Sequence, residues 1–182
     1  MAVKTFTTEV LTSADTNTYL ANSGLVYIKS QTVGSAVSSV TVSSAFSATY
    51  DNYLITMAGG TVSADTAINM QLGSSTTGYY GFLTYGASNT NTIVGAGRSN
   101  AVAAYWVGGG VGGQNAHVRV ELLSPFLSAY TKILNGDYQN GGNYGTMQGE
   151  HRVASAYDNF TLLPDVGTLT GGTITVYGYR KA

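Results

Sequence analysis

The residues best suited to acid–base chemistry lie around the two histidines of the chain. His117, Arg119 and Glu121 alternate along a segment of β-type sequence, so their side chains share one strand face over roughly 13 Å. We interpret this row as an exposed or inter-subunit line of ion pairs, as is usual for charged strand faces. Residues 150–152 (Glu-His-Arg) are consecutive, so in a strand they alternate between faces and cannot converge. Neither histidine predicts an active site.

No metal, phosphate or cofactor motif is present in the sequence. The chain lacks cysteine, which removes thiolate nucleophiles and thiolate zinc ligands. Asn135, Asp137 and Asn140 carry oxygens suited to Ca²⁺, but their spacing matches no calcium loop and is typical of a Gly/Asn turn. Residues 108–113 are glycine-rich without the lysine of a phosphate loop, which predicts a flexible hairpin connection. We therefore expect no metal and no cofactor.

An enzyme is disfavoured for a related reason. A glycosidase needs two carboxyl groups on either side of the scissile bond, and no such pair is evident in the sequence. Only a fold that brings Asp137 and Glu150 together would supply one. The expectation is a protein without catalytic residues.

Two loops are candidate binding surfaces, because they combine tyrosines with glycine, asparagine and hydroxyl residues. They are residues 73–82 and 138–145. Aromatic faces give stiff apolar contacts and amides give adaptable hydrogen bonds, a combination suited to glycans and protein surfaces. The alternative is that glycine permits the turns and tyrosine covers the sheet edge. The candidate binding residues are Tyr79, Tyr80, Tyr138, Asn140, Asn143 and Tyr144.

The composition favours a component of a larger assembly. Only 9% of the 182 residues are charged, and Gly (24), Tyr (14) and small polar residues replace them. Hydroxyls and amides can be buried with hydrogen bonds, whereas an unpaired buried charge costs several kcal/mol (about 3–5 when one partner of a pair is removed). A net charge of −1 without a basic cluster argues against nucleic acid as a partner. No apolar run is long enough to predict membrane insertion.

From residue 24 onward the pattern is β throughout. Short segments rich in Val, Ile, Thr and Tyr recur between Gly, Asn, Ser or Asp. They predict an all-β domain over residues 24–182, an antiparallel β-sandwich of the jelly-roll type. Alternation is clearest at residues 117–122 and 173–179, where Val, Ile or Leu occupy every second position. The predicted strands are 25–29, 36–42, 53–58, 67–72, 78–85, 101–107, 117–123, 130–134, 147–153, 160–163 and 173–179.

One internal echo connects two of these strands. Residues 48–55 contain Tyr-Asp-Asn-Tyr, and residues 155–162 contain Tyr-Asp-Asn-Phe. In a functional interpretation, the two aspartates would form a paired site. We favour two turns that lead into core strands, because turn acids usually bond nearby backbone, and the echo is consistent with approximate two-fold symmetry.

Residues 1–23 differ from the rest and predict an N-terminal anchoring arm with a short helix. Residues 12–15 resemble a capping box, and Gly24 is placed as a helix C-cap glycine. A helix this short needs a partner surface. An N-terminal strand and turn folded into the same domain is the alternative. The anchoring residues of the predicted arm are Leu11, Asp15, Tyr19 and Leu20.

Three stretches together resemble structural proteins of tailed bacteriophages. Residues 6–20 (FTTEVLTSADTNTYL) are similar to the arm that precedes a β-domain in those proteins. Residues 46–53 (FSATYDNY) resemble the strand entry of the same proteins, and residues 172–179 (GTITVYGY) resemble their closing strand. The resemblance spans nearly the whole chain.

The resemblance implies a non-enzymatic virion protein, made in the bacterial host cytoplasm and assembled as a homotrimer. It implies partners among capsid, tail or fibre-platform proteins, with no catalytic residues to carry over. Because the β-domain follows the arm at once, a short fibre or surface appendage that contacts host glycans is expected. A capsid decoration or cement protein, or a carbohydrate-binding receptor module, is the alternative.

Overall fold

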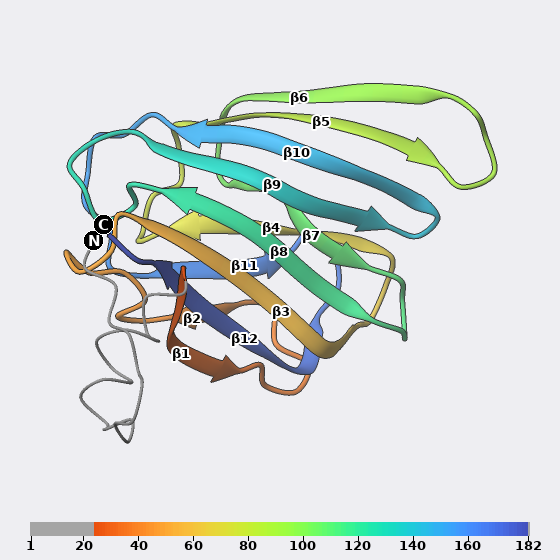
Figure 1. The fold of residues 1–182 in the computed structure, drawn as a ribbon. Coiled ribbons are helices and arrows are strands. Elements are labelled where there is room, and N and C mark those ends of the chain that lie inside the picture. The colour runs from red at the N-terminus through yellow and green to blue at the C-terminus, as the bar shows by residue number, and fades with distance from the viewer. Residues whose placement is uncertain (1–23, 182) are drawn as a thin grey trace, which may run out of the picture.

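A computed structural model describes residues 24–181, which contain twelve strands and no helix (Figure 1). The all-β class predicted from the sequence is confirmed. The predicted arm, with Leu11, Asp15, Tyr19 and Leu20, lies outside the described residues. The strands are β1 (Leu25–Thr32), β2 (Val40–Val42), β3 (Asn52–Val62), β4 (Thr66–Leu72), β5 (Tyr79–Ala87), β6 (Ile93–Ala101), β7 (Ala104–Gly110), β8 (Ala116–Leu123), β9 (Thr131–Asn140), β10 (Asn143–His151), β11 (Phe160–Pro164) and β12 (Leu169–Tyr179).

The strands form one mixed, nearly closed, barrel-like sheet that is folded into two layers. The larger layer runs β1-β12-β3-β8-β9-β10-β5-β6, and the smaller runs β2-β11-β4-β7 (Figure 1). Antiparallel pairing of β7 with β8 joins the layers on one side. On the other side, a bridge from Val37 to Leu169 brings the residues before β2 against β12. The parallel bridge from Gly110 to Asn140 makes the sheet mixed.

The core lies between the layers, because each strand turns alternate residues toward it. Along β8, Ala116, Val118, Val120 and Leu122 are buried and the residues between them are not, as the alternation predicted. Buried and less buried residues alternate in the same way along the C-terminal half of β12, where Ile174 and Val176 are buried. Strand β4 is buried along almost its whole length, since it lies in the middle of the smaller layer.

The two Tyr-Asp-Asn segments lead into core strands, as expected. The backbone carbonyl of Asp51 accepts from Ser124 N at 2.7 Å, and that of Asp158 accepts from Ala45 N at 2.6 Å. The aromatic residues that follow, Tyr53 and Phe160, are fully buried. The echo therefore marks two bends that place matching aromatic side chains in one core, and their carbonyls bond distant segments rather than nearby backbone as expected.

Three local predictions were wrong. Strand β6 was not predicted, because its Gly-Ala-Gly-Arg-Ser-Asn sequence lacks the usual strand composition. Residues 108–110 lie in buried β7 rather than in a flexible connection. Residues 135–140 lie in β9 rather than in a turn, with Asn135 at a positive φ of 56° where the pairing with β10 shifts register.

Candidate functional site

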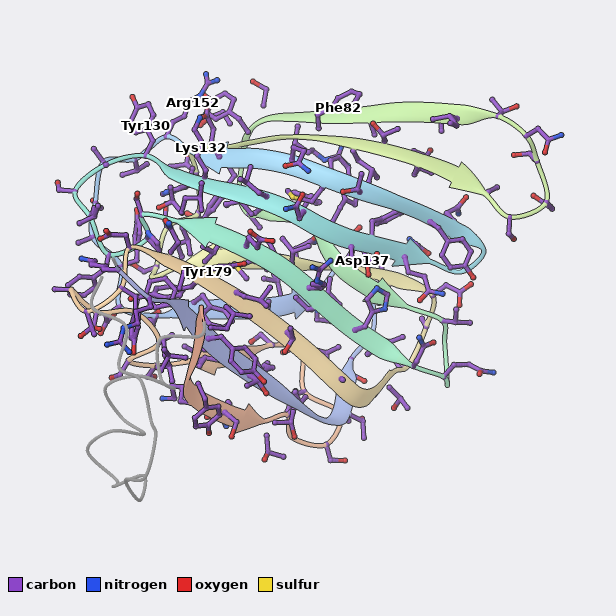
Figure 2. All side chains as sticks on the ribbon, in the orientation of Figure 1. Phe82, Tyr130, Lys132, Asp137, Arg152 and Tyr179 are labelled. Carbon is purple, nitrogen blue, oxygen red and sulfur yellow. The ribbon has the colours of Figure 1, made fainter. Side chains whose placement is uncertain are left out.

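A shallow groove crosses the outer face of β5, β10 and β9. It combines aromatic, amide and charged side chains. Figure 2 shows Phe82, Lys132 and Arg152 along this margin of the molecule, with Tyr130 beside them. The groove is lined by Tyr80, Gly81, Phe82, Lys132, Leu134, Gln148, Gly149, Glu150 and Arg152.

Strand register brings these side chains together. On β5 and β10, Tyr80 lies opposite Glu150 and Phe82 lies opposite Gln148. On β10 and β9, Glu150 lies opposite Lys132. Directly opposed residues of antiparallel strands point to the same face, so all five side chains stand on the outer face.

Glu150 is the electrostatic centre of the groove. Lys132 Nζ donates to its Oε2, and Arg152 Nε donates to its Oε1 at 2.5 Å. These two hydrogen bonds, that of Lys132 first, lower the pKa of Glu150 below its ordinary value. The Arg152 guanidinium also lies 4.1 Å from the centre of the Tyr80 ring, a cation–π distance. The carboxylate is therefore ionised at neutral pH and paired with both cations.

Phe82 supplies an apolar surface beside these ions. Its side chain is 55% exposed, and its ring lies over Gly95 of β6, where a Cβ atom would come within 2.7 Å of Phe82 Cζ. Gln148 is held by Asn135, because its Nε2 donates to Asn135 Oδ1 at 3.1 Å. The groove thus offers an aromatic surface next to oriented hydrogen-bonding groups, which is suited to a ligand with apolar faces and hydroxyls.

One serine–histidine pair forms in the described part of the chain, between Ser75 Oγ and His151 Nε2 at 2.9 Å. Ser75 Oγ donates to the carbonyl of Thr77 at 3.1 Å, and His151 Nε2 lies 3.1 Å from the same carbonyl. A carbonyl only accepts, so Nε2 carries the hydrogen and cannot take the serine proton. The ring is fully buried, and its Nδ1 has no hydrogen-bond partner among residues 24–181. The pair ties the loop before β5 to β10 and lacks the orientation of a nucleophile with its base.

The six predicted binding residues are not brought together. Tyr80 lies in the groove, opposite Glu150, whereas Tyr144 lies opposite Gly86 near the other end of β5 and β10. The six-residue separation along β10 corresponds to about 20 Å. Asn140 and Asn143 flank the turn between β9 and β10, where Asn143 Nδ2 donates to the Asn140 carbonyl at 3.1 Å.

Two of the six predicted residues pack inside the protein. Tyr79 is 1% exposed, and its hydroxyl accepts from Leu72 N at 2.6 Å. Burial raises its pKa to about 12. Tyr138 is 7% exposed and packs edge-on against Tyr85, with ring centres 5.8 Å apart. These two side chains serve the core rather than the surface.

The row His117, Arg119 and Glu121 faces outward on β8, as predicted, but within residues 24–181 its members form no ion pairs with one another. His117 Nε2 lies 2.9 Å from the Asp137 carbonyl oxygen and 3.9 Å from its carboxylate. Asp137 lies opposite Thr146 on β10, four residues from Glu150, so roughly 13 Å of strand separates the two acids. Glycosidase carboxyl pairs lie about 5–9.5 Å apart, so this geometry does not form one. Figure 2 shows Asp137 away from Lys132 and Arg152.

Sequence reasoning missed Phe82, Lys132 and Arg152 as members of one site. The available signal was the alternation of residues 130–134 and 80–84, but their pairing partners depend on the register of β9, β10 and β5. Within residues 24–181, no three His, Asp or Glu side chains come close enough to hold a metal ion. The same residues contain no helix that could cross a membrane.

Comparison of the chain with protein-family models, with curated proteins and with solved structures finds no match.

Proposed function

We propose that this chain is a non-enzymatic structural protein of a tailed-bacteriophage particle, in which residues 1–23 attach the protein and the β-body forms contacts with copies and partners. The body is proposed to be an elaborated jelly roll. The copy number of three implied by the resemblance stays a prediction.

Strand order supports the jelly-roll assignment. In an eight-stranded jelly roll, the first, eighth, third and sixth strands form one sheet, and the second, seventh, fourth and fifth form the other. Counting from β2 to β11, with β8, β9 and β10 together taken as the seventh strand, gives the layers β2-β11-β4-β7 and β3-(β8, β9, β10)-β5-β6. Strands β12 and β1 extend the second layer beyond β3. Jelly rolls are common in viral capsid proteins and in lectins.

The observation that carries the proposal is the surface of the body, which has few charges and several uncovered apolar side chains. Ile93 is 76% exposed, Phe82 is 55% exposed and Val94 is 41% exposed, and all three lie on the β5–β6 hairpin. With 9% charged residues in the chain, these side chains are not dispersed among ions as on an ordinary soluble domain. Uncovered apolar surface of this kind marks contact sites.

The proposal is tested on purified particles with an antibody against the full chain. Labelling at a regular position in electron micrographs is the expected result, and a chain found only outside the particles contradicts it. Leu11→Asp and Leu20→Asp variants of the full chain are expected to fold and to lose attachment. Val166→Asp is the matched control, because it changes an exposed apolar residue of the body, and it should keep attachment.

Recognition of a surface glycan is a second candidate function, favoured by the groove. Phe82 offers a ring face on which a sugar can stack, and the ion set of Glu150, Lys132 and Arg152 offers acceptors and donors for hydroxyl groups.

A glycan array tests this second candidate with the full chain and two variants. Phe82→Ala is expected to abolish binding, and Tyr144→Ala is expected to keep it, because Tyr144 lies at the other end of β10. The reverse result would assign binding to the turn between β9 and β10. An array without binding contradicts glycan recognition and leaves the structural role untouched.

A further inference from the structure

Strand β6 is an open sheet edge. Among residues 24–181 it pairs with β5 alone, and it ends the larger layer at the margin opposite β1 (Figure 1). Seven of its nine residues are exposed and none is buried. From Ile93 to Arg98 its pairing with β5 is regular, so the outer edge presents a straight row of backbone donors and acceptors. Such an edge is a template for another strand.

The other two edges of the sheet carry the features that normally prevent strand addition. Strand β2 has only three residues. Strand β1 is interrupted by a register shift between Tyr27 and Lys29. Short length, bulges and lysine are the common protections of edge strands.

Strand β6 has none of these protections along residues 93–98, and its own register shift lies beyond them, between Arg98 and Ala101. It contains no proline and no acidic residue, and its one cation, Arg98, is directed away from the edge. The Arg98 guanidinium lies 4.9 Å from the ring centre of Tyr105 and 4.8 Å from that of Trp106, both on β7. The outer edge of β6 therefore carries no charged side chain along residues 93–98, although Arg98 is part of the strand.

The absence of charge along this edge fits a second copy of the same chain. A two-fold contact places each residue opposite residues of its own strand, so a charged edge repels itself. Residues 93–97 are Ile-Val-Gly-Ala-Gly, which has no such repulsion. The pairing satisfies both edges at once and leaves none open, whereas a foreign strand would need its own second edge protected.

We propose that β6 pairs antiparallel with β6 of a second copy across a two-fold axis near Gly95 and Ala96, which joins the larger layers of two molecules into one sheet. The pairing brings Ile93 and Phe82 of both copies together on the outer face. Val94 and Ala96 of both copies meet on the inner face, which carries the buried Leu83 of β5. The inference rests on the proposed function in one respect, that the body makes contacts with its own copies, and it differs from the resemblance in the copy number, two in place of three.

The first test is the mass of the full chain and two double variants by light scattering. The parent is expected at twice the chain mass at tens of micromolar, and Ile93→Lys with Val94→Lys is expected at the mass of one chain. The matched control, Leu127→Lys with Val166→Lys, also replaces two exposed apolar residues and should keep the parent mass. Circular dichroism of all three proteins checks that the β-structure is retained.

The second test does not depend on how the fold tolerates lysine. The chain has no cysteine, so Ala96→Cys introduces a single thiol close to the proposed axis. A short bifunctional thiol reagent should link most chains in pairs, whereas Ala129→Cys, on an exposed loop away from β6, should stay single.

Three outcomes would overturn the inference. Equal linking of the two cysteine variants would do so, as would a trimer whose mass the β6 lysines do not change. A trimer would leave the proposed structural role standing, so the two failures are distinguishable. A parent protein found at the mass of one chain would also overturn the inference.

Discussion

The two ends of the body use similar residues for different purposes. Around β3 and β11, Phe46 packs against Tyr53 and Phe160 with ring centres 4.8 and 5.6 Å apart, and all three side chains are buried. At the β5–β6 hairpin, Phe82 and Ile93 stand in solvent. Apolar side chains thus hold the fold together at one end and remain available for contacts at the other. Stability and assembly should therefore respond to different mutations.

The largest expected effect comes from a glycine of the closely packed region. A Cβ atom at Gly109 would come within 1.7 Å of the Gln139 carbonyl oxygen, so Gly109→Ala forces two backbones apart. We expect a loss of about 4 kcal/mol or more in the free energy of unfolding, or no folded protein.

The control for this change is Gly97→Ala in the hairpin, where the nearest atom is Gly81 O at 3.8 Å. It is expected to change stability by less than about 1 kcal/mol. Urea denaturation followed by circular dichroism measures both variants. A Gly109→Ala protein as stable as the parent would refute the packing of β7 described above.

Removing one aromatic ring from the core and one from the β5–β6 hairpin tests the same difference in packing. Phe160→Ala removes a fully buried ring and should cost about 3–5 kcal/mol of unfolding free energy. Phe82→Ala removes a ring that is 55% exposed and should cost about 0.5 kcal/mol or less. The measurement is the urea midpoint of each variant. Equal losses would show that the hairpin is packed as tightly as the core.

The buried His151 predicts a pH dependence of stability. Burial lowers its pKa below the ordinary value of 6.5, so between the lowered pKa and 6.5 the unfolded chain binds a proton that the folded chain does not. The free energy of unfolding should therefore fall as the pH is lowered through 6.5, and stop falling below the lowered pKa.

His151→Gln keeps a donor for the Thr77 carbonyl and does not titrate, so it should remove this part of the pH dependence. His117→Gln is the control, because the His117 side chain is partly exposed on the sheet surface, and it should keep the dependence. Urea denaturation at a series of pH values compares them. An unchanged slope in His151→Gln would assign the dependence to other groups.

The smallest expected effect is that of the ion set in the groove. Glu150→Gln should cost about 0.2–1 kcal/mol at neutral pH, because its partners Lys132 and Arg152 are both half exposed. The pKa of Glu150 is lowered, so the difference from the parent should persist above 4.5 and disappear as the pH falls through the lowered pKa. A difference that survives in strong acid would mean that Glu150 acts through packing.

The sequence alone predicted the buried residues correctly where one face of a strand packs against the core. Val118 and Val120 on β8, and Ile174 and Val176 on β12, were assigned to the buried face because the two-residue period is unambiguous there. The Asp-Asn segments lead into core strands at Tyr53 and Phe160 as predicted, but the carbonyls of Asp51 and Asp158 bond the distant Ser124 and Ala45 rather than nearby backbone.

The sequence alone did not predict the structure of segments whose conformation depends on pairing with distant strands. Glycines 108–110 look like a flexible loop, but in β7 they allow close approach of neighbouring backbones, such as that of Gln139 at Gly109. Strand β6 is held by pairing with β5 rather than by its own composition. The groove forms because Lys132 lies opposite Glu150. This register depends on the bulge at Asn135, which no local sequence pattern predicts.

Hydrogen exchange at β6 tests most directly whether the open hairpin edge is where two copies meet. The full chain is compared with its Ile93→Lys and Val94→Lys double variant at the same concentration, and residues 40–42 of β2 serve as an internal reference. Slower exchange of residues 93–101 in the parent than in the variant, with equal exchange in β2, is the predicted result. Equally fast exchange of residues 93–101 in both proteins would contradict it.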